Sequence, residues 1–252
     1  MSTRFLGQPF DIHTGGVDLI FPHHTDEVAQ SEAATGRKFV NYWLHNAFLQ
    51  MGAQKMSKSL GNIERVSEIV DRGVPRRALR LALQSAHYRA QLTFGEDSLQ
   101  AATSAIDRLD ALYAALAAYR NDGAGDAKLD SLLAQSRTAI EDALDDDLNV
   151  SPALAALFDL VRELNRRIDA RTLSTADAAK TTAFLRDVDR IFGIAPEQEG
   201  SLPPELQALL DERAAARAGR DWAASDRLRD ALAERGILVE DTRDGQRWRR
   251  TE

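Results

Sequence analysis

The segment FDIHTGGVDLIFPHHTDEVAQSEAATGRKFVNYWLHNAF, residues 10–48, decides the fold. Phe10–His13 and Phe39–Phe48 are rich in aromatic and β-branched residues, which is typical of buried strands. Between them, Pro22–Thr35 predicts a helix that begins with proline and ends at Gly36. A strand, a helix and a second strand indicate part of a parallel α/β sheet. The pattern is too short for a whole doubly wound domain, which needs several more such units.

After Arg65 the pattern becomes helical. Pro75–Ala86 and Glu96–Tyr119 carry apolar residues at spacings of three and four, as amphipathic helices do. Together with three further predicted helices, they indicate an antiparallel helical bundle. The three further helices cover Leu129–Ala143, Pro152–Asp169 and Thr175–Phe192.

The last fifty residues have a pattern of their own. Ala195–Pro204 has the proline and glycine content of a linker. Glu205–Ala218 and Asp221–Glu234 predict two helices, and Ile237–Val239 predicts a strand with which Gln246–Arg249 can form a hairpin. We therefore expect three parts: an α/β remnant over residues 1–62, the helical bundle over 63–195, and a small α+β domain over 203–252.

Composition narrows the class of protein. Of 252 residues, 44% are hydrophobic and 28% charged, which is ordinary for a globular protein and not for a disordered one. No stretch approaches the roughly 20 apolar residues of a membrane span, and the first ten residues do not predict a signal peptide. There is no cysteine, so disulfides and thiolate metal sites within the chain are excluded. We expect a cytoplasmic protein with no membrane contact.

Net charge gives a mixed signal about nucleic acids. The net charge of −7 argues against nucleic-acid binding, but local patches decide such binding. Four arginines surround Trp248 within Arg243–Arg250, against the single acid Asp244. This tail is either a basic-aromatic binding patch or a solvated charged end.

The sharpest motif is the string Lys55-Met-Ser-Lys58-Ser-Leu-Gly-Asn62. Two lysines beside small hydroxyl residues form a cationic loop that can close over a polyphosphate and stabilise its transition state. An arbitrary Lys-x-Ser-Lys-Ser is more often a solvated basic turn. The complete string, placed after a β-rich segment, favours the phosphate-binding interpretation.

Two smaller patterns precede this loop. His23 and Glu27 stand four residues apart in a predicted helix, so both can meet one ion, although such pairs are more often surface pairs. Gly15, Gly16 and Asp18 suit an adenosine site, because glycines allow close backbone approach and a carboxylate accepts from ribose hydroxyls. Taken alone, Gly-Gly-x-Asp is a common turn.

The lysine string resembles the signature loop of class I aminoacyl-tRNA synthetases, and the surrounding sequence resembles cysteinyl-tRNA synthetases in particular. The likeness covers nearly the whole chain. It is carried by Phe10–His13, Gly15–His24, Glu27–Glu32, Asn41–His45, Ser85–Arg89, Asp145–Asn149 and Asp221-Trp222. The resemblance implies ATP-dependent activation of L-cysteine and its transfer to a cysteine tRNA. It also implies that this chain is the C-terminal portion, without the first nucleotide-binding motif, and inactive alone.

The resemblance also implies roles for single residues. Lys58, with Lys55, contacts the ATP phosphates, and Asp18 with the two glycines contacts the adenosine. His23 and Glu27 are half of a zinc site whose other ligands are two cysteines earlier in the family's sequence. His13 lies beside the cysteine pocket and is otherwise a core histidine at a strand end. Two further histidines, His24 and His45, are expected to be structural; Thr14 departs from the three successive glycines usual in the family.

For the C-terminal part, the resemblance implies that four residues contact the tRNA anticodon: Arg217, Trp222, Asp226 and Asp241. An exposed tryptophan can stack an unpaired base, and arginines and carboxylates can read base edges. The alternative is that Trp222 packs the small domain's core and that the acids are solvated. Trp248 is either part of that core, with its arginines on phosphates, or part of the binding surface.

Two other functions remain open. One is a related ligase that joins cysteine to an amino-sugar pseudodisaccharide, which should have no anticodon module. The other is a non-catalytic tRNA-binding protein. The sequence leaves the oligomeric state open, with a monomer expected.

Overall fold

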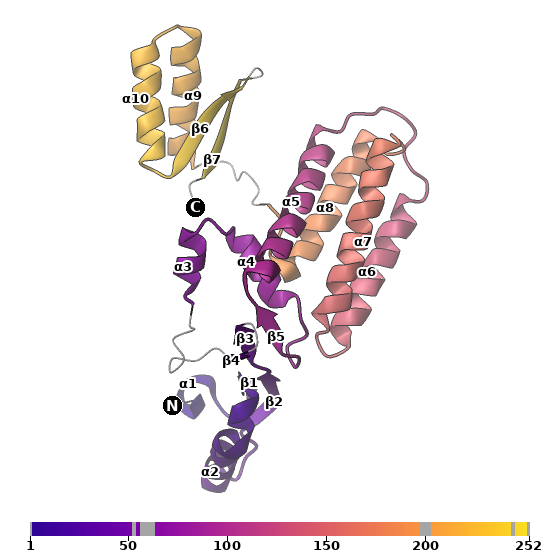
Figure 1. The fold of residues 1–252 in the computed structure, drawn as a ribbon, viewed down its shortest axis with the longest axis vertical. Coiled ribbons are helices and arrows are strands. Elements are labelled where there is room, and N and C mark those ends of the chain that lie inside the picture. The colour runs from indigo at the N-terminus through magenta and orange to yellow at the C-terminus, as the bar shows by residue number, and fades with distance from the viewer. Residues whose placement is uncertain (1, 52–53, 56–63, 197–202, 243–244, 251–252) are drawn as a thin grey trace. The chain divides into compact units, whose positions relative to one another are not determined.

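The computed structural model describes residues 2–51, 54–55, 64–196, 203–242 and 245–250. Its contacts divide the chain into two compact units, Met1–Pro196 and Glu197–Glu252 (Figure 1). Each unit has a hydrophobic core of its own. Within these described ranges, no helix is both long enough and apolar enough to cross a membrane.

The first unit opens with the predicted strand, helix and strand. After the short helix α1 (Ser2–Leu6), β1 (Phe10–Gly16) pairs in parallel with β2 (Val40–Asn46). Helix α2 (Thr25–Thr35) connects them and ends at Gly36, whose φ of 66° suits glycine. Phe10, Phe39 and Val40 form a small core beneath this pair, and Trp43 packs against it.

The start of α2 differs from the prediction. Pro22 does not begin the helix, because Phe21 has the extended φ and ψ of −136° and 131°. A 3₁₀ turn, η1 (Val17–Leu19), and a π turn, η2 (Ile20–His24), come first. Both turns lie between the end of β1 and α2, and they carry Asp18 and His23.

A second, smaller sheet was not predicted. Strand β3 (Leu49–Met51) pairs in parallel with β5 (Leu92–Phe94) and antiparallel with β4 (Gln54–Lys55). Because β5 immediately precedes the long helices, this sheet joins the α/β part to the helical part. Helix α3 (Val66–Asp71) lies between β4 and α4 (Arg76–Gln84), with Pro75 at the N-cap of α4.

Four long helices complete the first unit and pack around one extended core (Figure 1). Leu112, Leu164 and Leu173 are fully buried in it. The predicted boundaries agree with the observed ones to within two residues. The helices are α5 (Glu96–Ala118), α6 (Leu129–Asp145), α7 (Val150–Asp169) and α8 (Thr175–Phe192).

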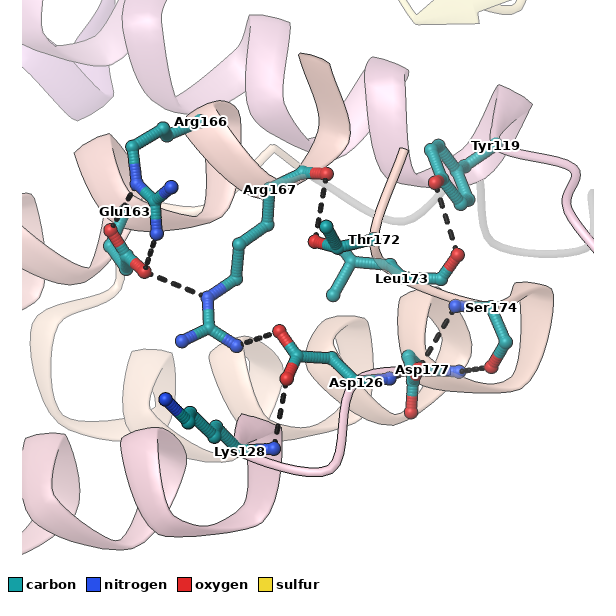
Figure 2. A network of polar contacts seen from close by, with 10 residues as sticks. All are labelled: Tyr119, Asp126, Lys128, Glu163, Arg166, Arg167, Thr172, Leu173, Ser174 and Asp177. Atoms are coloured by element: carbon teal, nitrogen blue, oxygen red, sulfur yellow. Dashed lines mark hydrogen bonds and ion pairs between the residues drawn. The ribbon is translucent and has the colours of Figure 1, made fainter. Parts of the chain in front are cut away.

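A polar network fastens one end of these helices (Figure 2). The buried guanidinium of Arg167 on α7 contacts Asp126 in the α5–α6 loop, and its Nε donates to Glu163 over 2.8 Å. Glu163 also accepts from Arg166 at 2.7 Å and 2.8 Å. These bonds to two guanidinium groups lower the pKa of Glu163 to about 2.

The same network caps α8. Asp177 accepts from the backbone N–H groups of Ser174 and Asp126, both over 2.9 Å, and Ser174 accepts from the Asp177 N–H (Figure 2). This reciprocal capping box satisfies N–H groups that the first helical turn leaves free. The loop before α6 is thereby held to the beginning of α8.

The second unit is a helical hairpin followed by a strand hairpin. It comprises α9 (Pro204–Ala218), α10 (Trp222–Ala233), β6 (Ile237–Thr242) and β7 (Gly245–Arg250), with β6 and β7 antiparallel. Leu210, Leu232 and Ile237 form its core, and Trp248 packs against them. Trp248 therefore belongs to the core.

Candidate functional site

A histidine–carboxylate cluster forms where β1 meets α2. His13 projects from β1, and its Nε2 lies 3.4 Å from Oε2 of Glu27 in the first turn of α2. Nε2 of His23 lies 3.7 Å from the other oxygen, Oε1, of the same carboxylate. The two histidines therefore approach Glu27 on different oxygens. The predicted pair, His23 and Glu27, is close in space, and His13 joins it.

His24 packs against His13 of this cluster, and His45 in turn contacts His24. His24 is buried, and its Nδ1 lies 2.8 Å from Nε2 of His45 on β2. Burial lowers the pKa of His24, and repulsion from His13 lowers it further. The His13 ring stacks on Trp43 with centroids 4.6 Å apart. The burial of His24 and its hydrogen bond with His45 fit the structural role expected for it.

The donor set fits a zinc ion. Imidazole and carboxylate are ordinary zinc ligands, and bonds of about 2.0–2.1 Å place two ligands of a tetrahedral ion roughly 3.3 Å apart. The 3.7 Å between His23 and Glu27 is close to that separation. Ligand atoms of His13, His24 and Glu27 also lie within 4.8 Å of one another. Nδ1 of His13 and Oε2 of Glu27 are buried without a hydrogen-bond partner in the described part of the chain.

The glycines after His13 are needed for close approach by the chain's own side chains. A Cβ on Gly15 would lie 2.6 Å from Cε1 of His24, and one on Gly16 would lie 2.4 Å from Oδ1 of Asp18. Gly15 therefore makes room for the buried His24. Asp18 is exposed in η1, at the carboxyl end of β1.

A cavity of about 500 Å³ opens at the carboxyl ends of β1 and β2. Thr14 and Asn46 line it from the strands, and His87, Tyr88 and Leu148 line it from the helical part. Ligands of parallel α/β sheets bind beside the carboxyl ends of the strands. The cavity lies on the side of the sheet where a nucleotide is expected.

The lysine loop lies largely outside the described residues. This applies to Lys58 and to the side chain of Lys55, whose backbone ends β4. Because ATP and cysteine must meet in one pocket, we expect this loop to lie close to the histidine–carboxylate cluster, and this stays a prediction.

The four predicted anticodon residues lie on three elements of the second unit. Nη1 of Arg217, on α9, is 3.1 Å from Oδ2 of Asp241 on β6. The same guanidinium carbon lies 5.5 Å from the ring centroid of Trp222, at the start of α10. Trp222 is 56% exposed, so it does not pack the core. Three of the four residues are thus brought together.

Asp226 is tied to this group less directly. It lies 3.3 Å from Arg229, one turn further along α10. The positive charge of Arg229 also contributes to lowering the pKa of Asp241. Asp226 therefore lies at the edge of the group formed by Asp241 and the arginines that pair with it, which we call the arginine–carboxylate group.

The sequence analysis missed Arg213. This side chain is 1% exposed, and its Nη1 and Nη2 donate to Oδ1 and Oδ2 of Asp241 over 3.0 Å and 3.1 Å. Arg213 and Arg217 stand four residues apart on α9, so they share one face. That spacing was a signal in the sequence that both could reach one carboxylate.

Three family models match successive segments of the chain. The model of the tRNA synthetases class I (C) catalytic domain matches residues 1–104, and the DALR domain matches 139–196. The cysteinyl-tRNA ligase anticodon binding domain matches 199–249. A cysteine--tRNA ligase from Lactococcus lactis subsp. cremoris is 43% identical over 250 residues, covering 99% of this chain. The chain belongs to the cysteinyl-tRNA synthetase family.

Other members of the cysteinyl-tRNA synthetase family give the same picture. The cysteine--tRNA ligase of Oenococcus oeni is 39% identical over 252 residues, which are 99% of this chain and 54% of that relative. The Lactococcus relative is covered to 52%. The chain thus spans about half the length of the curated relatives it matches.

A solved structure supports the class I fold. The LeuRS of Agrobacterium radiobacter K84, in a ternary complex with tRNA and LeuAMS, superposes with a TM-score of 0.61. The superposed region covers 75% of this chain and 26% of the LeuRS chain, with 16% sequence identity. A likeness at this identity is evidence for the fold alone.

Proposed function

We propose that this chain forms part of a cysteine--tRNA ligase, which activates L-cysteine with ATP and transfers it to the 3′ end of a cysteine tRNA. The observation that carries the proposal is the family match over 99% of the chain, at 39–43% identity to two cysteine--tRNA ligases. The closeness of His13 and His23 to Glu27 in the structure also supports it.

In this proposal, His23 and Glu27 hold a zinc ion together with ligands from the family's remaining sequence. When bound, zinc would supply a soft cation that binds the thiolate of the substrate cysteine more strongly than the hydroxyl of serine. His13 contacts the Glu27 oxygen that His23 does not, and so orients the carboxylate. The buried His24–His45 pair fixes the backbone between the two predicted ligands.

The nucleotide is proposed to lie at the carboxyl ends of β1 and β2. Gly15, Gly16 and Asp18 face ATP there, Asp18 with its carboxylate on the ribose. Lys58, with Lys55, stabilises the charge that develops on the phosphates during cysteine activation. The cavity that Thr14 lines at the carboxyl ends of these strands supports this placement.

The remaining parts are proposed to bind the tRNA. Residues 1–62 belong to the catalytic domain, 63–195 to the helical part, and 203–252 to the anticodon-binding domain. Because only Asp146–Asn149 separates α6 from α7 and the two helices pack together, they run antiparallel. Arg217, Trp222, Asp226 and Asp241 contact the anticodon. We expect a cytoplasmic monomer.

The match to an anticodon binding domain disfavours the amino-sugar ligase, which needs no such domain. A non-catalytic tRNA-binding role shares the second unit with our proposal and differs in the first. The two are separated by testing chemistry at His23 and Lys58.

A chimera tests the proposal. The chain replaces its matching half in the Lactococcus lactis relative, and cysteine-dependent ATP–pyrophosphate exchange is measured. We expect exchange from the chimera, its loss by at least about 100-fold with Lys58→Ala or His23→Ala, and none from the isolated chain. Lys128→Ala, in the α5–α6 loop, is the matched control and should leave exchange unchanged.

A folded chimera that binds cysteine tRNA without exchange would contradict the catalytic part of the proposal. Robust exchange by the isolated chain would contradict its dependence on further sequence.

A further inference from the structure

The interior of the second unit holds an arginine where an apolar residue would be expected. Arg213 is 1% exposed, and the described residues of this unit form a small core of Leu210, Leu232 and Ile237 with Trp248 packed against them. Besides Asp241, its Nη1 donates to Oε1 of Gln246 over 2.7 Å. The interior of this small unit is therefore partly polar.

Strand register explains how one guanidinium reaches both acceptors. Asp241 on β6 and Gln246 on β7 are directly opposed across the hairpin. Side chains at such positions lie side by side on one face of the sheet. Gln246 is fixed in turn, because its Nε2 donates to the carbonyl of Leu210 on α9 over 2.6 Å. Arg213 is thus held from both sides, and it holds Asp241.

Stability alone does not account for this arrangement. Replacing a buried ion pair by well-packed apolar residues is often neutral or stabilising, so the pair is weak evidence for a stabilising role. Asp241 is also 40% exposed, so the pair aims an otherwise accessible carboxylate. Among the residues that the structure describes, Nε of Arg213 is buried without a hydrogen-bond partner, so the guanidinium is not fully satisfied.

Asp241 links the buried Arg213 to residues on the exposed surface. Oδ2 of Asp241 accepts from Arg213 and forms an ion pair with Nη1 of Arg217, and Arg217 lies over the Trp222 ring. Planar guanidinium–carboxylate pairs fix both partners in one plane. The chain of contacts therefore runs from the interior, through one carboxylate, to the arginine–tryptophan face.

We propose that Arg213 is a positioning residue for anticodon reading, which fixes the Asp241 carboxylate so that it accepts from one N–H edge of an unpaired base. This inference rests on the proposed function of the second unit. A carboxylate has about four acceptor sites on its two oxygens. Oδ1 and Oδ2 each accept from Arg213, and Oδ2 also pairs with the charge of Arg217, so Oδ1 retains a site for a base amino or imino group.

The test measures binding of the whole 252-residue chain to a cysteine tRNA transcript and to three transcripts, each changed at one anticodon base. The discrimination ratio is the dissociation constant for the changed transcript divided by that for the unchanged one. We expect Arg213→Lys, which keeps the charge and loses the paired geometry, to lower this ratio about tenfold at one anticodon position only. Arg235→Lys, an exposed arginine at the end of α10, is the control and should change no ratio.

A double-mutant cycle separates positioning from folding. Asp241→Asn should lower the ratio at the same position, and adding Arg213→Lys should lower it no further, because Arg213 acts through Asp241. If Arg213→Lys loses its helical circular dichroism, Gln246→Met provides the second variant. It removes the other acceptor of Arg213 and should give a smaller loss at the same position.

Several results would overturn the inference. These are an unchanged ratio in Arg213→Lys, an equal loss at all three positions, or full additivity with Asp241→Asn. In each case a wild-type chain that still discriminates leaves the proposed function standing. A wild-type chain that binds all four transcripts equally overturns the proposed function, and this inference with it.

Discussion

The histidine–carboxylate cluster and the arginine–carboxylate group both centre on one acid, but they balance its charge differently. Glu27 lies among imidazoles, of which buried His24 has a lowered pKa, and Oε2 of Glu27 has no hydrogen-bond donor in the described residues. Asp241 lies between two guanidinium groups, which lower its pKa. The first acid suits an added cation, whereas the second is already neutralised within its unit. Metal should therefore matter to one and not to the other.

The largest expected effect concerns zinc binding by the histidine–carboxylate cluster. Glu27→Gln keeps the shape of the side chain but removes the negative charge that both histidines face. We expect zinc affinity of the chain, measured by competition with a chromogenic chelator, to fall by about 100-fold. Glu32→Gln on the same helix is the control for charge; if it weakens zinc binding equally, the cluster is not the site.

The next effect concerns tRNA binding by Trp222, which lies beside the arginine–carboxylate group. Trp222→Ala removes the exposed indole beneath Arg217, and stacking is worth about 1–3 kcal/mol per base. We expect affinity for cysteine tRNA, measured by filter binding, to fall by about tenfold or more, with Trp222→Phe intermediate. Ile191→Ala, an equally exposed apolar residue on α8, should bind as the wild type does. Superimposable curves for Trp222→Ala would remove the stacking role.

An ion pair in the helical part gives a structural baseline for both sites. The pKa of Glu163 falls from 4.5 to about 2, and its side chain is 28% exposed. Because the folded pKa is lowered, the contribution is complete above pH 4.5 and is lost as pH falls towards 2. We expect Glu163→Gln to lower the free energy of unfolding by about 1–2 kcal/mol at pH 7, and the gap to close by pH 2.

Urea denaturation across this pH range measures that gap. Asp159→Asn, in an exposed pair with Arg162, should change the free energy of unfolding by less than about 0.5 kcal/mol. A gap that persists undiminished at pH 2 would show that Glu163 acts by packing and not by charge.

The smallest effect appears only in alkali. Burial raises the pKa of Tyr113 to about 12 from 10. The unfolded chain ionises first, so stability falls as pH rises from 10 towards 12. Tyr113→Phe should be within about 0.5 kcal/mol of wild type at pH 7 and should flatten that alkaline decline. Tyr42→Phe, which is exposed, should leave the decline in place.

Much of the fold could be predicted because the signals are local. Helix α8 was predicted with its observed ends, since Ser174 caps its start and Gly193, with a φ of 64°, ends it. The sheet of β3, β4 and β5 was missed because strands of two or three residues carry no periodicity. The start of α2 was misplaced because proline usually opens a helix, whereas here extended Phe21 precedes two separate turns.

The sites show the same division. Spacing of four residues was enough to bring His23 to Glu27, and the family resemblance added His13, which lies on another element. Arg213 was missed because the sequence does not tell a buried arginine from a solvated one. Its burial depends on contacts with Asp241 and Gln246, which lie 28 and 33 residues further along the chain and oppose each other in the β6–β7 register.

The central contrast is tested most directly by anticodon discrimination measured with and without zinc. The whole chain is titrated with cysteine tRNA and with a transcript changed at one anticodon base, in excess magnesium, with either added zinc or a zinc-selective chelator. We predict the same discrimination ratio in both conditions, because the Arg213–Asp241–Arg217 group carries its own counter-charges. A ratio of one, or a ratio that is lost when zinc is removed, would contradict the account.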